Sequence, residues 1–312
     1  MDKKSGNQEV EAIERLPEVF EKIKSEIRQV IVGQDEIVDQ LLVSLFARGH
    51  CLLIGVPGLA KTLLINTLGE IMDLKFSRIQ FTPDLMPSDI TGTEIIEEDM
   101  QTGKKAFKYI RGPVFANIIL ADEINRTPPK TQSALLEAMQ EYKVTAAGES
   151  YDMSLPFFVL ATQNPIEQEG TYPLPEAQLD RFMFNLWLDY PSAQEEKQIV
   201  IQTTGSDESK PARIISKEEI IAYQDLVRKI PVADNVVDAA VRLVAATRPG
   251  KNGTFDYINE WIRWGAGPRA SQYLVLGAKV RSALQGRITP DISDIKKMAL
   301  PVLRHRIVVS YN

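Results

Sequence analysis

Apolar residues recur at helical spacing in the first part of the chain, and shorter apolar runs come after them. The helical spacing predicts two helices, at residues 13–30 and 37–46, joined by a turn. The shorter runs have the length of strands and alternate with further helical stretches, one after the run at 51–54 and one from Pro128. The strands are predicted at residues 51–54, 75–81, 118–121 and 157–164, and in the segment directly after Arg181.

After Pro191 the strand-like runs stop. The polar stretch TTGSDESKPAR separates the last third of the chain from the core, as a linker would. We therefore expect a first domain at residues 1–190, a linker at 191–216 and a helical domain at 217–312. The helical periodicity of the last domain covers residues 220–227, 236–246, 273–284 and 292–303.

Two other segments are predicted to form β-hairpins. In residues 94–110 an acidic first arm can face a basic second arm across the strands. In residues 143–154 the chain turns at Gly148. Taken alone, the hairpin at 94–110 could be a decoration of the surface.

The composition narrows the class of protein. The 312 residues are 44% hydrophobic and 25% charged, which is typical of a globular chain of about two domains. A net charge of −6 argues against broad binding to nucleic acid. The single cysteine, Cys51, excludes an internal disulfide, and the first ten residues lack an apolar signal segment. We expect a cytoplasmic protein without a transmembrane segment.

The segment CLLIGVPGLAKT, residues 51–62, carries the first candidate chemistry. It is predicted to form a strand, a glycine-rich turn and the start of a helix, an arrangement that binds phosphate oxygens. Lys61 can reach the β- and γ-phosphates of a nucleotide, and the Thr62 hydroxyl can bind Mg²⁺. The segment departs from the usual phosphate-loop pattern at Ala60, where glycine is common.

The segment NIILADEINR provides a pair of carboxylates. Its apolar run predicts a buried strand that ends at Asp122 and Glu123. An acidic pair at the end of a strand often only caps a helix. Downstream of a phosphate loop, however, Asp122 can hold Mg²⁺ through water and Glu123 can activate the water that attacks the γ-phosphate.

Two further polar residues lie after strand-like or helical runs. Asn164 ends a strand, where its amide could contact both the attacking water and the γ-phosphate. It could also be a turn-forming residue before Pro165. Arg181 could reach the γ-phosphate of a neighbouring subunit, or it could be an ordinary exposed arginine.

The motifs GVPGLAKT, IILADEINR, ATQNP, PEAQLDRF and GPRAS occur in this order over nearly the whole chain. Together they resemble the MoxR family of AAA+ ATPases, in which alanine also precedes the lysine of the phosphate loop. The resemblance implies that Asn164 is the sensor 1 residue, Arg181 the arginine finger and Arg269 the sensor 2 residue. It implies a Walker B pair, Asp122 and Glu123. It also implies nucleotide contacts from a Walker A segment that contains Gly55, Pro57, Gly58, Leu59, Ala60, Lys61, Thr62 and Leu63.

The resemblance also implies a fold and further contacts. The fold would be α/β, an αβα sandwich with a parallel sheet (the AAA+ core), followed by an all-helical lid. Val32, Gly33 and Gln34 would lie beside the adenine, although the residues alone favour a simple turn. The hairpin at 94–110 would be the helix-2 insert, and that at 142–156 the presensor hairpin. Arg269 begins a predicted helix, and the sequence leaves open whether it contacts its own nucleotide, a neighbour's, or only the domain interface.

The function implied by the resemblance is ATP hydrolysis with Mg²⁺ by a homo-oligomeric ring, expected to be a hexamer. Such a ring would remodel or mature protein clients, with von Willebrand factor A domain proteins as candidates. The alternative is a nucleic-acid motor or a magnesium-chelatase-like subunit, because the helix-2 insert occurs in those families too. The second hairpin carries only Lys143 as a cation, so nucleic acid is not the expected partner. A nucleotide switch that scarcely hydrolyses is disfavoured by the presence of both Glu123 and Arg181.

Overall fold

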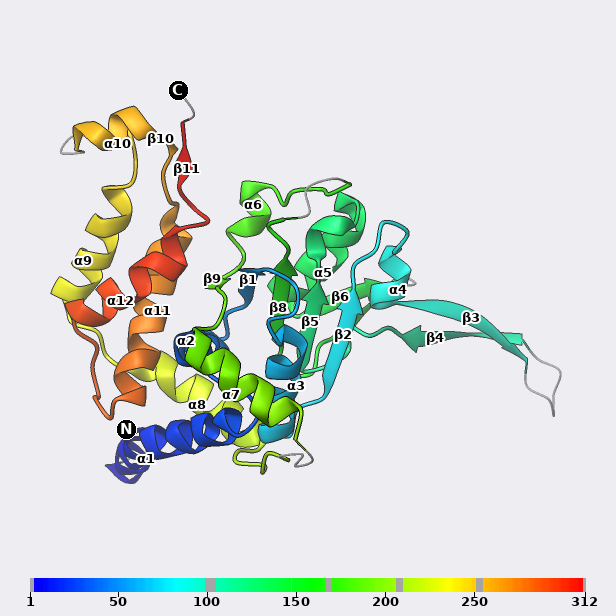
Figure 1. The fold of residues 1–312 in the computed structure, drawn as a ribbon, viewed down its shortest axis with the longest axis horizontal. Helices are drawn as coiled ribbons and strands as arrows, with labels where there is room; N and C mark the ends of the chain where they lie inside the picture. Colours follow the sequence, from blue (N-terminus) through cyan, green and yellow to red (C-terminus); the bar gives the residue numbers. More distant parts are fainter. Residues whose placement is uncertain are drawn as a thin grey trace.

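The computed structural model describes residues 3–98, 105–146, 148–166, 170–205, 210–250 and 255–310. A five-stranded sheet lies at its centre in the order β2-β5-β8-β1-β9, and each neighbouring pair of strands is parallel (Figure 1). All carboxyl ends of the strands therefore lie at one edge of the sheet. The strands are β1 (Cys51–Gly55), β2 (Phe76–Gln80), β5 (Ile118–Asp122), β8 (Phe158–Gln163) and β9 (Phe184–Leu188).

Helices cover both faces of the sheet. Successive residues of a strand point to opposite faces, so neighbouring apolar residues of one strand pack against different helices. Leu53, for example, packs into a cluster with α1, α2 and α3, whereas Leu52 packs into a second cluster with α5. The expected αβα sandwich with a parallel sheet is confirmed. The helices are α1 (Lys3–Arg28), α2 (Asp35–Phe46), α3 (Lys61–Ile71) and α5 (Pro129–Glu141).

The lid is mostly helical and shares the first hydrophobic cluster with α1 and α2. The expectation of an all-helical lid is wrong in one place. Strands β10 (Ile262–Trp264) and β11 (Val308–Val309) form a short antiparallel ribbon. Its two arms are far apart in the sequence, so no local pattern marks the pairing. The lid helices are α8 (Lys217–Lys229), α9 (Asp234–Ala245), α10 (Asp256–Trp261), α11 (Pro268–Leu284) and α12 (Ile292–Leu303).

Part of the predicted linker at 191–216 is a helix, α7 (Ala193–Thr203). Ser192 and Glu195 form a capping box at its start: the Ser192 N–H donates to Glu195 Oε2 at 2.8 Å, and the Glu195 N–H donates to the Ser192 hydroxyl oxygen at 3.3 Å. A capping box gives hydrogen-bond partners to backbone N–H groups at the start of a helix, which have no partner within the helix itself, and so stabilises the start of the helix. The S-x-x-E spacing is therefore the signal that identifies this helix.

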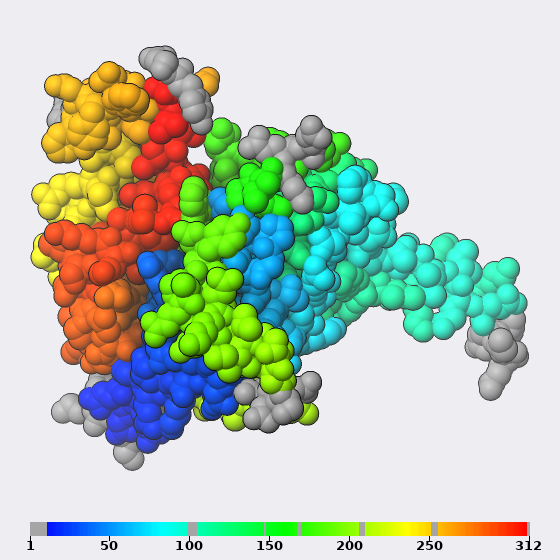
Figure 2. Space-filling model, viewed as in Figure 1, coloured from blue at the N-terminus to red at the C-terminus, as the bar shows by residue number. Residues whose placement is uncertain are grey.

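Both predicted hairpins are present in the described residues. Strands β3 (Gly92–Glu98) and β4 (Lys105–Arg111) project from the body of the molecule, as Figure 2 shows, and Lys108 Nζ lies 3.0 Å from a Glu97 carboxylate oxygen. The turn of this hairpin lies outside the described residues. The second hairpin is β6 (Lys143–Ala146) with β7 (Glu149–Asp152). Short helical segments, α4 (Pro87–Thr91), η1 (Ile124–Arg126) and α6 (Glu176–Leu179), lie in stretches where no helix is predicted.

None of the helices in the described ranges combines the length and the apolar character needed to cross a membrane.

Both histidines of the chain are buried. His50 Nε2 lies 3.2 Å from the Met139 carbonyl oxygen, and the Val159 N–H donates to His50 Nδ1 at 3.1 Å. The second contact requires an unprotonated Nδ1, so His50 is neutral. Burial lowers the pKa of His50 to about 4, and burial together with the nearby Arg306 lowers the pKa of His305 to about 3.

These two residues predict an acid-sensitive fold. In the unfolded chain a histidine binds a proton below about pH 6.5, whereas the two buried side chains bind one only at lower pH. Protonation therefore favours the unfolded state, and the free energy of unfolding falls as the pH drops below about 6.5. Between about pH 7.5 and 5.5 we expect the free energy of unfolding to drop by about 1.4 kcal/mol per histidine. Urea unfolding at both pH values measures the drop, and His50→Gln is expected to remove about half of it. An equal drop in the parent and the variant would contradict this assignment.

Candidate functional site

The loop between β1 and α3 turns through a left-handed backbone conformation. Gly58 has φ 85° and Ala60 has φ 55°. Glycine adopts this region without strain, which explains its preference at the position of Ala60. Lys61 Nζ donates to the carbonyl oxygens of Gly55 at 2.6 Å and Val56 at 3.0 Å, so the ammonium lies over the loop. Burial lowers the pKa of Lys61, an effect that Asp122 and Glu123 oppose.

A pocket of about 500 Å³ opens at the carboxyl edge of the sheet above this loop. It brings together residues from the phosphate loop and from the ends of β2, β5 and β8. Ten of the predicted site residues line it together. The pocket is lined by Pro57, Gly58, Leu59, Ala60, Lys61, Thr62, Leu63, Arg78, Gln80, Asp122, Glu123, Thr162 and Asn164.

Asp122 is held by two donors, one on each carboxylate oxygen. The Thr162 hydroxyl donates to Oδ1 at 2.6 Å, and Arg78 Nη2 donates to Oδ2 at 2.6 Å. A carboxylate fixed in this way is oriented before any ligand arrives. Arg78 and Thr162 are not among the residues singled out from the sequence, although a threonine inside the apolar run of β8 is a usable signal.

Glu123 is anchored through one of its two oxygens. Oε2 accepts from Gln80 Nε2 at 3.0 Å and lies 3.1 Å from Arg126 Nε. Within the described residues, both contacts fall on Oε2 and none falls on Oε1. Gln80 is a second residue missed by the sequence analysis. Its signal is the strand register, because Gln80 pairs directly with Asp122.

Asn164 is buried, and its amide is only half satisfied. Oδ1 accepts from the Ile166 N–H at 3.1 Å, whereas the buried Nδ2 has no hydrogen-bond partner among the described residues. A buried unpaired amide is costly, and a phosphate oxygen in the adjoining pocket would satisfy it. The site therefore suits a nucleotide phosphate.

The donors around the phosphate loop also suit a Mg²⁺ ion held mainly by phosphates. The described residues contain no cluster of three or more histidine, cysteine or carboxylate side chains that could hold a metal by themselves. Thr62 and Asp122 line one pocket, so a Mg²⁺ ion there would rest on the Thr62 hydroxyl, the phosphates and water held by Asp122.

A second pocket of about 380 Å³ adjoins the other side of the loop. Val32 and Gln34 line it together with Leu59 and residues of α7, and Gln34 Nε2 donates to the Leu59 carbonyl oxygen at 3.4 Å. Gly33 does not line the pocket. A Cβ at Gly33 would meet Glu195 Oε1 at 2.4 Å, so glycine lets α7 approach the loop. The mainly apolar walls suit an adenine ring.

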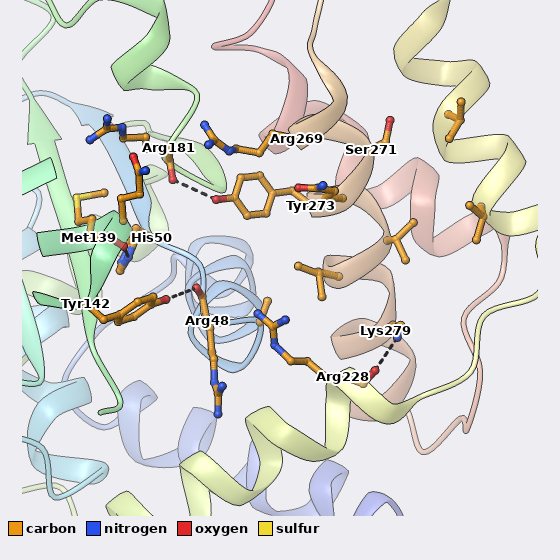
Figure 3. A pocket seen from close by; sticks show the side chains of 17 residues that line it. Arg48, His50, Met139, Tyr142, Arg181, Arg228, Arg269, Ser271, Tyr273 and Lys279 are labelled. Carbon is orange, nitrogen blue, oxygen red and sulfur yellow. Dashed lines mark hydrogen bonds between the residues drawn. The ribbon is translucent and has the colours of Figure 1, made fainter. Parts of the chain in front are cut away.

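Arg181 and Arg269 lie elsewhere, in a cavity of about 750 Å³ between the core and the lid (Figure 3). Arg181 Nη1 donates to the Leu136 carbonyl oxygen at 2.9 Å, and Arg269 Nη1 lies 2.7 Å from Asp180 Oδ2. Arg181 precedes β9, so this cavity opens at the amino edge of the sheet. The structure does not bring either arginine to the phosphate pocket of its own chain.

Comparison with known proteins matches this geometry to a family. Residues 50–184 match the model of the ATPase family associated with various cellular activities (AAA), and residues 257–312 match an AAA lid domain. The chain is 44% identical to the chaperone MoxR1 of Mycobacterium tuberculosis over 293 residues, which cover 94% of this chain and 76% of that relative. The chain belongs to the MoxR family of AAA+ ATPases.

Other relatives agree over similar lengths. The MoxR-family chain is 42% identical to the uncharacterised protein YeaC of Bacillus subtilis, over 95% of this chain and 89% of that relative. A solved structure from Cytophaga hutchinsonii, named as a candidate ATPase, superposes with a TM-score of 0.89 at 41% identity. That match covers 99% of this chain and 92% of the other.

The geometry predicts separable defects at Lys61 and Glu123 in this MoxR-family chain. Lys61→Ala removes the cation over the phosphate loop, so ATP binding should be lost. Glu123→Gln removes the proton acceptor but keeps the shape of the side chain, so binding should persist while hydrolysis stops. Calorimetric titration with ATP and a phosphate-release assay measure the two effects. Lys75→Ala, at a lysine whose ammonium donates to the Phe115 carbonyl oxygen on the surface, is the matched control. Equal loss of affinity in the Lys61 and Glu123 variants would refute the assigned roles.

Proposed function

We propose that this protein hydrolyses ATP at the interfaces of a homo-oligomeric ring and uses the energy to remodel protein clients. The observation that carries the proposal is the position of the two halves of the site. The phosphate loop, Asp122, Glu123 and Asn164 lie at the carboxyl edge of the sheet, whereas Arg181 lies at the amino edge. Two such surfaces can complete one site only between adjacent copies.

Each residue has a role in the proposed reaction. Lys61 holds the β- and γ-phosphates, and Asn164 orients the γ-phosphate through its unpaired amide nitrogen. Glu123 accepts the proton of the attacking water through Oε1 while Oε2 stays anchored. Mg²⁺, when bound, neutralises charge on the phosphates. Arg181 and Arg269 of the adjacent copy then stabilise the charge that develops on the γ-phosphate.

The same proposal covers the organisation of the chain. Residues 1–190 act as the nucleotide-binding domain, 191–216 as the connection and 217–312 as the lid. The ring is proposed to be a hexamer in the cytoplasm. The chaperone name of the Mycobacterium tuberculosis relative supports work on protein clients. Von Willebrand factor A domain proteins are the candidates that the family resemblance suggests.

A nucleic-acid motor remains the second candidate, and the hairpins argue against it. Lys105 and Lys108 on the first hairpin lie 4.0 and 3.0 Å from Glu98 and Glu97. On the second hairpin, Lys143 lies 3.4 Å from Asp152. These cations are already neutralised across the strands, so they add little attraction for a phosphate backbone.

The proposal predicts that Arg181 acts on a neighbouring subunit. Arg181→Ala should slow hydrolysis about 10³-fold, as for other arginine fingers, and should leave ATP binding intact. Mixing Arg181→Ala with Lys61→Ala subunits in equal amounts should recover activity at only about a quarter of the interfaces, because one pairing in four joins an intact loop to an intact finger. The same mixture with Arg269→Ala in place of Arg181→Ala tests whether Arg269 also acts on a neighbouring subunit.

The measurement is the steady-state phosphate-release rate per subunit over a dilution series. Arg242→Ala, which removes an exposed arginine on α9, is the control. The proposal fails if a dilute monomer hydrolyses ATP at the full rate and Arg181→Ala behaves like the parent.

Client binding gives a separate prediction. The Glu123→Gln form should hold ATP and a client together, because the step that releases both is blocked. Affinity capture with this form should recover client proteins in the presence of ATP and not in its absence, and Lys61→Ala should recover none. Recovery of nucleic acid in place of protein would favour the second candidate.

A further inference from the structure

The cavity between the core and the lid has an unusual balance of charge. Its lining contains five cationic side chains and no carboxylate. Figure 3 shows Arg181 and Arg269 at one end of the cavity and the other three cations at the opposite end. The walls come from the core near the ends of α2 and α5 and from α8, α9 and α11 of the lid. The five cations are Arg48, Arg181, Arg228, Arg269 and Lys279.

Only two of these cations have a carboxylate partner among the described residues. Arg48 Nη2 lies 2.7 Å from Asp225 Oδ1, and Arg269 is paired with Asp180. Arg181 donates to a carbonyl oxygen, and so does Lys279, whose Nζ lies 2.9 Å from the Arg228 carbonyl oxygen.

For the Arg228 guanidinium, the described residues offer no hydrogen bond or ion pair, and burial together with this guanidinium lowers the pKa of Lys279. Within the described part of the chain, three positive charges thus lack a counter-charge, although the net charge of the whole sequence is −6. Such a cavity attracts an anionic partner.

A complementary surface lies beside the nucleotide pocket. Its carboxylates come from the first turns of α2 and α7. Glu196 lines the adenine-side pocket, is exposed and has no cationic partner among the described residues. Hydrogen bonds with Ser192 lower the pKa of Glu195, and the nearby Asp35 carboxylate opposes this lowering. Asp35 itself is already paired with Arg28, whose Nε lies 2.9 Å from Asp35 Oδ1. We call this surface the acidic rim, and it consists of Glu36, Glu195 and Glu196.

The acidic rim and the cationic cavity cannot meet within one chain. The rim borders the loop at the carboxyl edge of the sheet, whereas the cavity opens at the amino edge. Two distinct, complementary patches on one chain favour head-to-tail contact between copies. The proposed function already requires Arg181 and Arg269, at one end of the cavity, to approach the phosphate pocket of another copy. That pocket shares Leu59 and Leu63 with the pocket that the rim borders.

We propose that the cationic cavity between core and lid is the docking site for the acidic rim of the adjacent copy, with Arg228 and Lys279 as its electrostatic receptor. This proposal rests on the proposed ring function and names the surfaces that assemble it. Arg228 and Lys279 act by positioning the neighbour and make no contact with the reacting phosphate. Because the cavity walls belong to both domains, docking also fixes the lid against the core.

Charge reversal tests the docking. Arg228→Glu should raise the protein concentration for half-maximal ATPase activity about tenfold or more, because like charges would then face each other. The rate at saturating protein should stay near that of the parent. Glu36→Lys, at a rim residue that lines neither nucleotide pocket, should have the same effect, and the double variant should recover most of the loss. Arg242→Glu, an equal charge change at an exposed residue of α9 outside the cavity, is the matched control.

Assembly itself is followed by sedimentation velocity with ATP over the same concentrations, using the full chain. Arg228→Gln repeats the test without introducing a carboxylate, in case the reversal disturbs folding. Higher salt should weaken assembly of the parent more than that of the Arg228→Gln variant. Pyrophosphate is added to the parent as a probe for binding of a free anion.

The outcomes separate this proposal from the proposed function. Arg181→Ala lowers the saturating rate without moving the half-maximal concentration, whereas Arg228→Glu does the reverse. The docking proposal is overturned if Arg228→Glu and Arg228→Gln assemble like the parent, or if the double variant shows no recovery. It is also overturned if the Arg228 variants lose binding of pyrophosphate but assemble normally, because Arg228 would then bind a free anion and not the adjacent copy. None of these results would restore activity to Arg181→Ala.

Discussion

The direction of the five strands is the constraint on which the rest of this molecule depends. Residues that are more than 40 positions apart in the sequence, such as Lys61, Asp122 and Asn164, share one pocket because β1, β5 and β8 all run the same way. Reversal of any of these strands would move its last residue to the opposite edge. A parallel sheet must be covered on both faces, and the strands meet this demand with apolar side chains on both sides.

The opposite edge of the sheet is organised by the lid. Asp180 is bonded to Arg269 and also to Arg306, whose Nε lies 2.7 Å from Asp180 Oδ1. The Tyr273 hydroxyl donates to the carbonyl oxygen of Arg181 at 3.2 Å. Two lid elements therefore hold the short segment that carries Arg181, the proposed arginine finger. The orientation of Arg181 is a property of the core–lid contact as much as of the core.

The sequence predicts the sheet, the covering helices and ten of the thirteen residues that line the phosphate pocket, because each lies at the end of an apolar run or in a motif with a fixed shape. It does not predict Gln80 as a partner of Glu123, since that contact depends on the register of β2 against β5. The β10–β11 ribbon is missed for a similar reason, because residues 262 and 309 are paired only by the folded lid. The position of Arg269 beside Asp180, away from the phosphate loop, also depends on how the lid is placed.

Backbone strain marks the two surfaces that the proposed ring brings together. Six of the described residues other than glycine have a positive φ. Gln34, Ala60 and Glu123 each precede a helical segment that starts at the nucleotide pockets. Two more, Arg48 and Tyr142, line the cationic cavity, and only Asp73 lies in neither place. A left-handed residue costs about 1–2 kcal/mol relative to an ordinary conformation, and such strain gathers where function fixes the backbone. Its presence at the cavity as well as at the phosphate loop supports the view that both surfaces are parts of one composite site.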